Sequence, residues 1–271
     1  MSVLLGRGDG SFDPKRDYPV GVGPLSLAVG DVNGDGKLDL ATPGPNTVSV
    51  LVGRGDGSFD PSRVYATGTN PESVSIADLN GDGKADVVTA NETRSLSVLL
   101  SRGDGSFAPH VDYATPGNPW SVPVGDLNGD GKPDLATANL DADTVSVLVN
   151  RGDGTFAPEV HFPSGPRPRW LAIGDLNGDG KLDLANANVA ANTVSVLLNT
   201  TTLCTVPAVV GKTVVAAKRA IARAGCRVGK VTRAYSRRVK KGRVVAEKPK
   251  AGTVLPGGGK VNLVVSRGRK R

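Results

Sequence analysis

Short apolar stretches with a period of two recur along residues 1–200. Leu25-Ser-Leu-Ala-Val29 and Leu38-Asp-Leu-Ala-Thr42 flank a polar loop, and Thr47-Val-Ser-Val-Leu-Val52 follows them. Alternation of this kind predicts β-strands, because successive side chains of a strand point to opposite faces. The same series returns three more times, so the sequence predicts a mainly β protein built from repeated groups of strands.

Each polar loop is a copy of one nine-residue motif, which first reads Asp31-Val-Asn-Gly-Asp-Gly-Lys-Leu-Asp39. The copies begin at residues 31, 78, 126 and 175 and are therefore 47, 48 and 49 residues apart. Such a period is typical of solenoids and propellers, in which each unit buries its apolar faces against its neighbours.

The motif carries side-chain oxygen atoms at positions 1, 3, 5 and 9. Glycines at positions 4 and 6 let the backbone turn, which leaves the carbonyl of position 7 free to point inward. Three carboxylates, one amide oxygen and one carbonyl suit Ca²⁺ better than Mg²⁺ or Zn²⁺. We therefore predict about four structural calcium ions, one per loop, with the lysines contributing only backbone carbonyls. The predicted ligands are Asp31, Asn33, Asp35, Lys37, Asp39, Asp78, Asn80, Asp82, Lys84, Asp86, Asp126, Asn128, Asp130, Lys132, Asp134, Asp175, Asn177, Asp179, Lys181 and Asp183.

The motif has two other interpretations. An EF-hand needs a glutamate at position 12 and a helix on either side, whereas position 12 is threonine or asparagine here and the flanks are predicted strands. Metal-free Asn-Gly and Asp-Gly hairpin turns are the simpler alternative. Four complete sets of oxygen ligands favour calcium.

Together with Gly53-Arg-Gly-Asp-Gly-Ser-Phe59, these features resemble the FG-GAP (VCBS-type) repeats of integrin-α-like β-propellers. The resemblance covers residues 1–200. It implies four-stranded blades around a central axis, about four of them, with a calcium loop between the first two strands of each blade.

The chain opens inside a repeat unit, because Met1 occupies the place of Val48 in the third strand. No basic start followed by an apolar run indicates a secretory signal. We therefore expect a chain truncated at its N-terminus relative to a longer array. Closure of a ring by the first strand against the last blade is the alternative.

The charge of the chain is divided between two regions. Residues 1–202 carry 14 Lys and Arg against 25 Asp and Glu, a net charge of −11, whereas residues 203–271 carry 19 against the single Glu247, a net charge of +18. Bound calcium would reduce the mutual repulsion of the carboxylates in the first region. No apolar run is long enough for a transmembrane helix.

The basic tail is predicted to be a second domain, residues 206–268, after a linker at 201–205. A helix from Thr213 to Ala224, with Thr213 as N-cap and Gly225 as C-cap, precedes strands at 227–232, 243–246 and 260–266. Val206-Pro-Ala-Val-Val-Gly211 and the order of elements resemble a PASTA domain. The resemblance implies association with peptidoglycan, and the unusual basicity adds anionic wall polymers as candidate partners.

Cys204 and Cys226 are the only cysteines and bracket the predicted helix. An even pair in a small domain indicates a disulfide and an extracytoplasmic location. Two reduced, buried thiols are the alternative.

The remaining candidate features are expected to have structural roles. Four Arg-Gly-Asp tripeptides occupy one phase of the repeat, where Asp-Gly is expected in hairpin turns rather than as an adhesive signal. Trp120 and Trp170 could stack on a sugar, but packing between blades is favoured. His110 and His161 lie near no nucleophile signature and are expected on surface strands.

The sequence thus predicts a non-enzymatic extracellular or cell-wall protein in which a calcium-stabilised propeller serves ligand recognition or adhesion. No catalytic and no cofactor-binding residue beyond the calcium ligands is assigned, and the propeller's own glycan or protein ligand is not identified. Nucleic acid is disfavoured, because only Tyr235 of the tail could stack on a base. The alternative is a fragment of a secreted carbohydrate-active enzyme.

Overall fold

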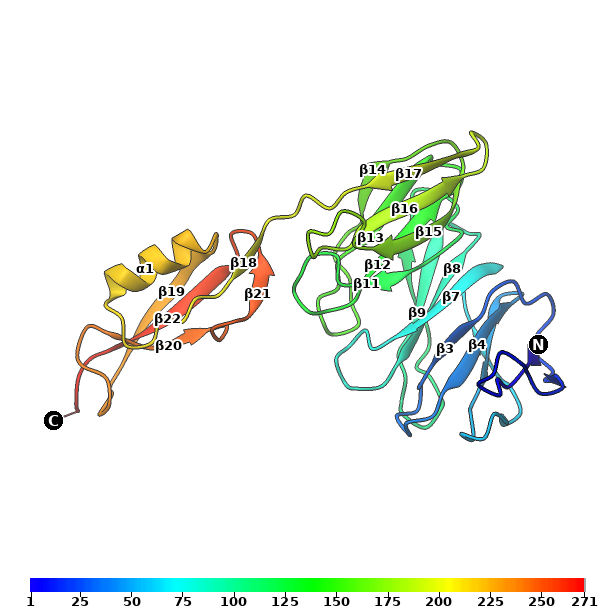
Figure 1. Ribbon diagram of the computed structural model, residues 1–271, viewed down its shortest axis with the longest axis horizontal. Coiled ribbons are helices and arrows are strands. Elements are labelled where there is room, and N and C mark those ends of the chain that lie inside the picture. The colour runs from blue at the N-terminus through cyan, green and yellow to red at the C-terminus, as the bar shows by residue number, and fades with distance from the viewer. Residues whose placement is uncertain (271) are drawn as a thin grey trace. The chain divides into compact units, whose positions relative to one another are not determined.

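The computed structural model describes residues 1–270, except the side chains of Leu203 and Pro256. Most of the chain up to Leu198 forms one compact unit, the repeat unit, and residues from Asn199 onward form most of the other, the tail unit (Figure 1). No described helix is long and apolar enough to cross a membrane.

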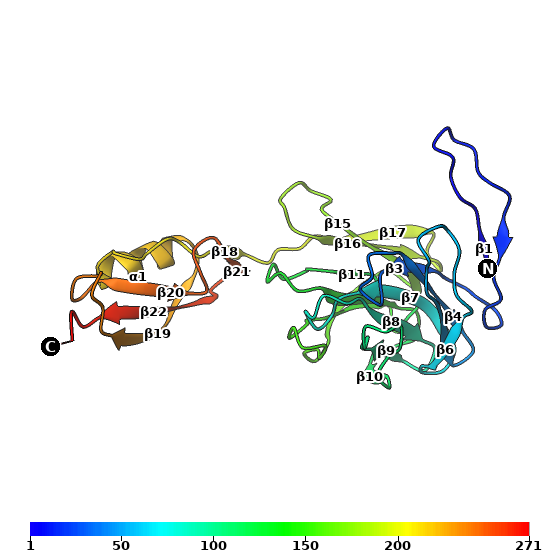
Figure 2. The same cartoon turned by 90° about the horizontal axis from the view of Figure 1, so that it is seen from below.

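The repeat unit is a series of antiparallel sheets, each of which is one blade (Figures 1 and 2). Four-stranded blades follow each other along the chain, a three-stranded blade ends the series, and a two-stranded N-terminal hairpin precedes it. The hairpin is β1 (Ser2–Val3) and β2 (Arg16–Asp17). Blade 1 is β3 (Ala28–Gly30), β4 (Asp39–Gly44), β5 (Thr47–Leu51) and β6 (Arg63–Ala66). Blade 2 is β7 (Pro71–Ala77), β8 (Asp86–Asn91), β9 (Ser95–Leu99) and β10 (Val111–Ala114). Blade 3 is β11 (Val124–Gly125), β12 (Asp134–Asn139), β13 (Thr144–Leu148) and β14 (Val160–Pro163), and blade 4 is β15 (Pro168–Gly174), β16 (Asp183–Asn188) and β17 (Thr193–Leu197).

The core of the repeat unit lies between blades rather than inside any one of them. Val87 and Val88 are successive residues of β8 and both are fully buried. Because neighbouring side chains of a strand point to opposite faces, Val87 joins the cluster shared with blade 1 and Val88 the cluster shared with blade 3. The predicted mainly β, propeller-like fold, in which blades bury their faces against neighbours, is confirmed.

An aromatic contact is repeated at the boundary between blades 1 and 2 and at the boundary between blades 2 and 3. Tyr65 of blade 1 meets Phe107 of blade 2 edge to face, with ring centroids 5.0 Å apart, and its hydroxyl donates to the carbonyl of Gly105 at 2.8 Å. Tyr113 and Phe156 repeat this arrangement between blades 2 and 3, at 5.2 Å. The first three blades are therefore joined through the same pair of positions.

The first strands of blades 1 and 3 are shorter than the alternation predicts. β11 comprises only Val124 and Gly125, although the equivalent β7 runs over seven residues. Pro123 has no N–H to donate, so the ladder cannot continue past it, and Pro119 is left in an isolated bridge with Asn139.

The tail unit packs helix α1 (Val214–Arg223) on a three-stranded sheet of β19 (Arg227–Ala234), β22 (Lys260–Ser266) and β20 (Val244–Lys248). Thr213 is the N-cap, as predicted, and its side chain accepts the N–H of Ala216. The C-cap is Ala224, so the helix ends one residue earlier than predicted and Gly225 follows with φ of +76°.

A second small sheet joins β18 (Leu203–Thr205) to β21 (Val254–Pro256). The sequence assigned residues 201–205 to a linker, and β18 shows that part of this stretch belongs to the tail unit. The disulfide between Cys204 and Cys226, with Cα atoms 5.2 Å apart, confirms the predicted pair and ties β18 to the end of the helix.

Candidate calcium loops and the contacts between blades

Backbone N–H groups of the loop donate hydrogen bonds to the aspartate at position 1 of the motif. In blade 1, Gly34 N donates to Oδ1 of Asp31 and Gly36 N to Oδ2, both at 2.7 Å. The loops that begin at Asp78 and Asp175 repeat both bonds. The two glycines have φ of +76° and +81°, a conformation that their lack of a Cβ makes inexpensive.

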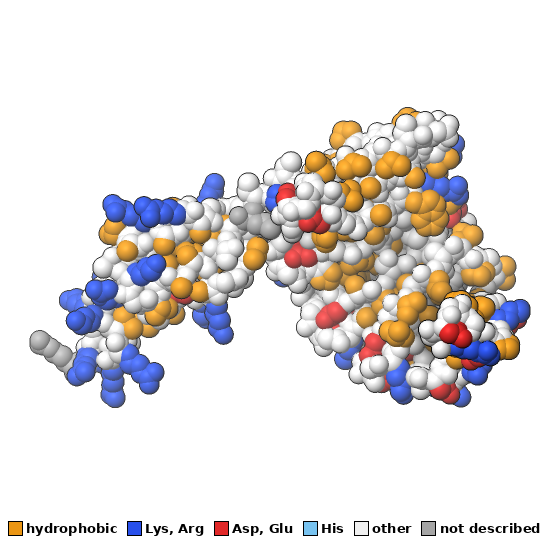
Figure 3. Space-filling view, in the orientation of Figure 1, with side chains coloured by type: hydrophobic (Ala, Val, Ile, Leu, Met, Phe, Trp, Pro, Cys, Tyr) orange, Lys and Arg blue, Asp and Glu red, His pale blue; other side chains and the backbone are white. Residues whose placement is uncertain are grey.

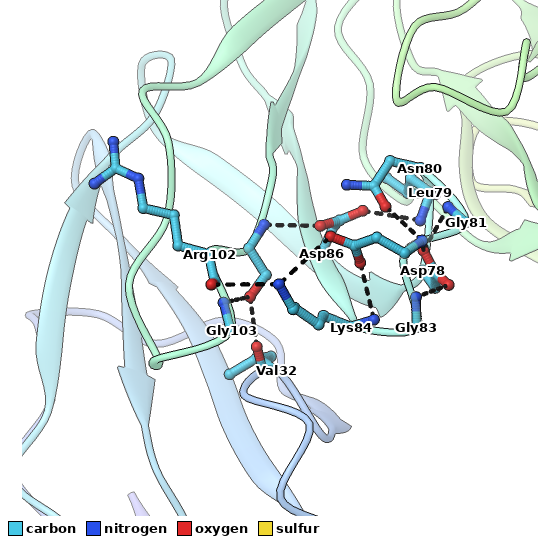
Figure 4. Close-up of polar contacts among 12 residues, drawn as sticks. Val32, Asp78, Leu79, Asn80, Gly81, Gly83, Lys84, Asp86, Arg102 and Gly103 are labelled. Atoms are coloured by element: carbon cyan, nitrogen blue, oxygen red, sulfur yellow. Dashed lines mark hydrogen bonds and ion pairs between the residues drawn. The ribbon is translucent and has the colours of Figure 1, made fainter.

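The aspartate at position 9 of the motif closes the loop by accepting two backbone N–H groups. Oδ2 of Asp86 accepts the N–H of Leu79 at 2.9 Å and Oδ1 accepts the N–H of Ser101 at 2.8 Å (Figure 4). Asp39 and Asp134 make the equivalent pairs of bonds in blades 1 and 3. All three aspartates are completely buried. Each carboxylate oxygen of Asp39 and Asp86 accepts one of these N–H groups, and a carboxylate oxygen has a second lone pair that can bind a cation.

The electrostatics of the loops favour a bound cation. Burial, and then repulsion from Asp82 and Asp78, raises the pKa of Asp86 to about 6. The pKa of Asp39 is raised for the same reasons, with Asp31 and Asp35 as the neighbouring charges. A divalent cation among these oxygens would offset both costs, since it favours the charged form of every carboxylate around it. The donor set, which is entirely oxygen, fits Ca²⁺.

The predicted ligands of each loop lie in one turn, but their carboxylates do not form a finished cage. The N–H of Asp35 donates hydrogen bonds to Oδ1 of Asp31, at 3.2 Å, and to Oδ1 of Asn33, at 3.0 Å. These two hydrogen bonds hold positions 1, 3 and 5 of the motif close together. Among residues 1–270, however, no three His, Cys, Asp or Glu side chains are grouped so as to hold a metal. The calcium assignment therefore stays a prediction.

The lysine at position 7 has a role that the sequence did not suggest. Beyond its predicted backbone carbonyl, its ammonium group approaches the carboxylate at position 5, with Lys37 Nζ 3.3 Å from Asp35 and Lys181 Nζ 3.0 Å from Asp179. In blade 3, Lys132 also donates to the carbonyl of Arg151 at 3.0 Å. In blades 2 and 3 the lysine side chain thus connects the loop to the Arg-Gly-Asp turn of its own blade.

A hydrogen bond crosses each of the first two blade boundaries at the calcium loops. Ser101, two residues after the end of β9 in blade 2, donates its hydroxyl to the carbonyl of Val32 in the loop of blade 1 at 2.5 Å (Figure 4). Asn150, at the same place in blade 3, donates its side-chain amide to the carbonyl of Leu79 in blade 2 at 2.8 Å. The backbone N–H groups of Ser101 and Asn150 bind the closing aspartates of their own loops. One residue therefore contacts two successive loops.

The Arg-Gly-Asp tripeptides form hairpin turns, in keeping with their structural interpretation. The carboxylate of Asp56 accepts both the N–H and the hydroxyl of Ser58, and these two hydrogen bonds lower its pKa. Arg54 pairs with Asp60 at 2.6 Å. The remaining three aspartates of these tripeptides, Asp9, Asp104 and Asp153, accept the equivalent N–H in their turns.

The two tryptophans have different environments. Trp120 of blade 3 lies under Arg169 of blade 4, with the guanidinium carbon 3.6 Å from the ring centre, which matches the expected packing between blades. Trp170 on β15 is 52 % exposed. His161 lies on β14, and its Nδ1 is 3.1 Å from the hydroxyl of Ser146, while Nε2 of His110 is 3.7 Å from Asp112.

Both units match known protein families. The FG-GAP-like repeat family matches residues 1–42, 31–89, 78–137 and 126–185, and the PASTA domain matches residues 205–267. The chain belongs to the FG-GAP-like repeat family and carries a C-terminal PASTA domain. This combination suits an extracellular or cell-wall-associated protein.

Similar proteins of known structure share the fold of the FG-GAP-like repeats. A protein from Agrocybe aegerita, described as recognising non-reducing terminal N-acetylglucosamine, is 24 % identical over 73 % of this chain and 60 % of its own, with a TM-score of 0.51. A proposed 6-phosphogluconolactonase from Bacteroides uniformis is 20 % identical over 72 % of this chain and 59 % of its own, also with a TM-score of 0.51. At these levels of sequence identity, the similarity shows only that the fold is shared.

One curated relative is similar to the PASTA domain. A probable serine/threonine-protein kinase of Clostridium acetobutylicum is 41 % identical over 64 residues, which are 24 % of this chain. The chain spans about a tenth of the length of that kinase.

Proposed function

We propose that this protein is a non-enzymatic surface protein whose PASTA domain binds an anionic cell-wall polymer, teichoic-acid-like or peptidoglycan, and whose FG-GAP-like repeats recognise a further ligand. The observation that supports it is a cluster of cations at one end of the PASTA domain. We call this cluster the cationic end; it consists of Arg237, Arg238, Lys240, Lys241, Arg267 and Arg269.

Backbone contacts bring the two segments of the cationic end together. Ser236 N donates to the carbonyl of Gly268, and Gly242 N donates to that of Ser266, each at 2.9 Å. All six cations are exposed, and within the described part of the chain no carboxylate is in contact with them. On the face of this domain that Figure 3 shows, nearly all of the charged side chains are Lys or Arg.

A surface of this kind attracts a polyanion. The domain region carries 19 Lys and Arg against one acidic residue, and the attraction of this excess positive charge for an anion extends over about 8 Å at physiological ionic strength. Repeated phosphate or carboxylate groups along a wall polymer could engage several cations at once, and multivalent contact raises the overall affinity. The PASTA fold is the second support for a partner in the wall.

Calcium in this proposal is structural and stiffens the repeat region. Each loop draws its ligands from one turn and places no nucleophile or general base beside them, which supports a role in stability rather than in catalysis. The repeats would then present a rigid surface, with Trp170 among its exposed aromatic residues.

Co-sedimentation of the full chain with purified Gram-positive sacculi tests the proposal. The variant R237Q/R238Q/K240Q/K241Q is compared with R7Q/R54Q/R102Q/R151Q, which removes the same number of positive charges from the repeats. We expect the first variant to lose most of its binding at moderate salt and the second to bind like the native chain. Equal losses would show an effect of net charge alone, and no loss in either would refute the role of the cationic end.

A second arm of the experiment separates the two polymers. Sacculi stripped of their anionic polymers by mild acid are compared with untreated sacculi. Binding that disappears on stripping identifies the anionic polymer, whereas binding that persists identifies peptidoglycan.

A further inference from the structure

Each candidate calcium loop contains an Asn-Gly pair at positions 3 and 4 of the motif, and the sequence has no other Asn-Gly pair. The pairs begin at Asn33, Asn80, Asn128 and Asn177. An asparagine that precedes glycine is especially open to deamidation, because glycine has no Cβ to shield its backbone nitrogen from the preceding side chain. The first three of these asparagines are half-buried and Asn177 is exposed, so none of them is closed off from water.

Deamidation of such a pair needs no enzyme and no reactant other than water. In the loop of blade 2, the backbone nitrogen of Gly81 would form a bond to Cγ of Asn80. The side-chain amide group would leave as ammonia and carry away the proton of the attacking N–H. Water then opens the resulting cyclic imide, at Cγ to give an aspartate or at the main-chain carbonyl to give an isoaspartate. The reaction therefore requires the glycine nitrogen to lose its proton and to face Cγ.

Two hydrogen bonds of the closed loop oppose this attack. Gly81 N donates to Oδ1 of Asp78 at 2.7 Å, so its proton is held by a carboxylate (Figure 4). Oδ1 of Asn80 accepts the N–H of Asp82 at 2.9 Å, which fixes the orientation of the amide that would be attacked. The asparagines of the other three loops accept the same N–H, at 2.8–3.0 Å. The loop must open locally before the imide can form.

In the first two loops, the following blade holds the residue directly before the Asn-Gly pair. The hydroxyl of Ser101 in blade 2 donates to the carbonyl of Val32, which precedes the first pair. The side-chain amide of Asn150 in blade 3 donates to the carbonyl of Leu79, which precedes the second pair. Val32 and Leu79 are themselves buried. Opening of either loop therefore also breaks a contact with the next blade.

We propose that the four Asn-Gly pairs are sites of spontaneous deamidation, and that closure of each loop controls the rate. In blades 1 and 2, the hydrogen bond from the following blade contributes to this control. A loop that opens is converted, and a loop that stays closed keeps its asparagine.

The two products change the loop in different ways. An aspartate keeps an oxygen atom at position 3 but adds a negative charge among the carboxylates of positions 1, 5 and 9. An isoaspartate places one additional carbon atom in the main chain between positions 3 and 4, so the backbone hydrogen bonds that close the turn lose their spacing. Water is in excess and the ammonia is lost, so neither change is reversed. Local opening of a blade boundary thus causes a permanent alteration of the adjacent loop.

Peptide mapping by mass spectrometry locates each deamidated asparagine and tests the proposal. The full chain is incubated with calcium at mildly alkaline pH, and a second sample is incubated in urea. All four asparagines should deamidate several-fold more slowly in the native chain than in the unfolded one. Ser101→Ala should accelerate the reaction at Asn33 and leave Asn80 at its native rate. Asn150→Ala should accelerate the reaction at Asn80 and leave Asn33 at its native rate.

Two further variants separate the contact between blades from a general loss of stability. Ser106→Ala removes a hydroxyl that bonds Asp104 in an exposed turn, and it should change neither rate. Ser101→Asn should keep the reaction at Asn33 slow, because asparagine supplies the donor at the equivalent position of blade 3. Native rates equal to those in urea would overturn the protective role of the loops. Alanine variants that accelerate both reactions equally, or neither, would overturn the role of the following blade.

Discussion

The hydroxyl of Ser101 donates a hydrogen bond to the carbonyl of Val32, which lies 69 positions earlier in the chain and in the preceding blade. The N–H of the same serine binds Asp86, which closes the candidate calcium loop of its own blade. Two loops are thus joined through a single residue, and Asn150 repeats the arrangement one blade later. The loops therefore stabilise the blade boundaries as well as their own turns.

Replacement of Ser101 by alanine should destabilise the repeats. The change leaves the buried carbonyl of Val32 without its donor, which costs about 1–3 kcal/mol of unfolding free energy. Urea unfolding in the presence of calcium measures the loss. Ser106→Ala is the control, since its hydroxyl bonds only Asp104 in an exposed turn. Equal losses of unfolding free energy in the two variants would show that the contact between blades does not contribute to stability.

Removal of calcium should destabilise the repeats and spare the PASTA domain. Without the metal, the acidic excess of residues 1–202 is uncompensated and buried carboxylates such as Asp86 lose their counter-ion. Calorimetry with a chelator should show a lower melting temperature for the repeats alone. Asp86→Asn should reduce the calcium stoichiometry by one, whereas Asp104→Asn, in an Arg-Gly-Asp turn, should leave it unchanged. A native chain that binds no calcium would refute the assignment of the loops.

Gly103→Ala should be more costly than Gly8→Ala. Both glycines occupy the same position of an Arg-Gly-Asp turn, with φ of +82° and +84°, so both changes introduce strain of about 1–2 kcal/mol. An added Cβ at Gly103 would lie 2.6 Å from Lys84, whereas nothing lies within 4 Å at Gly8. The difference in melting temperature between the two variants measures the packing of the lysine stem on the turn. Equal melting temperatures would mean that Lys84 moves away without loss.

Loss of the disulfide should affect only the PASTA domain. The bond closes a loop between residues 22 positions apart, and in the chain-entropy account such a loop contributes about 3 kcal/mol to stability. Cys204→Ser combined with Cys226→Ser should lower the melting temperature of this domain and leave the repeats as they are. Reductant added to the native chain should act in the same way. A lower melting temperature for the repeats would contradict the separation of the two units.

Much of the fold could be predicted because the signals are local. The alternation of apolar residues located the strands, and the spacing of the nine-residue motif located the blades. In the tail, Thr213 and the apolar face of the helix were sufficient to place α1. The two cysteines were paired correctly because the tail offers no other partner for either.

The missed features depend on residues that are distant in sequence. Ser101 and Asn150 align with Gly53, so the position varies among repeats, and its role appears only when the neighbouring blade is in place. The pairing of β18 with β21 joins two segments of the tail that are far apart in sequence, and it has no local signal. Pro123 could have indicated a shortened β11, because a proline within a strand pattern removes a ladder hydrogen bond.

The contacts that join the blades all reach from one repeat into the next. Tyr65 meets Phe107 and Ser101 meets Val32, and each of these positions recurs at the repeat period. Duplication within the gene of the second repeat, which carries Ser101, Phe107 and Tyr113, would therefore insert a blade that brings its own donor, its own acceptor and its own rings. No existing side chain would lose a partner. Such an array can lengthen or shorten during evolution by whole repeats, with selection acting mainly on its two ends.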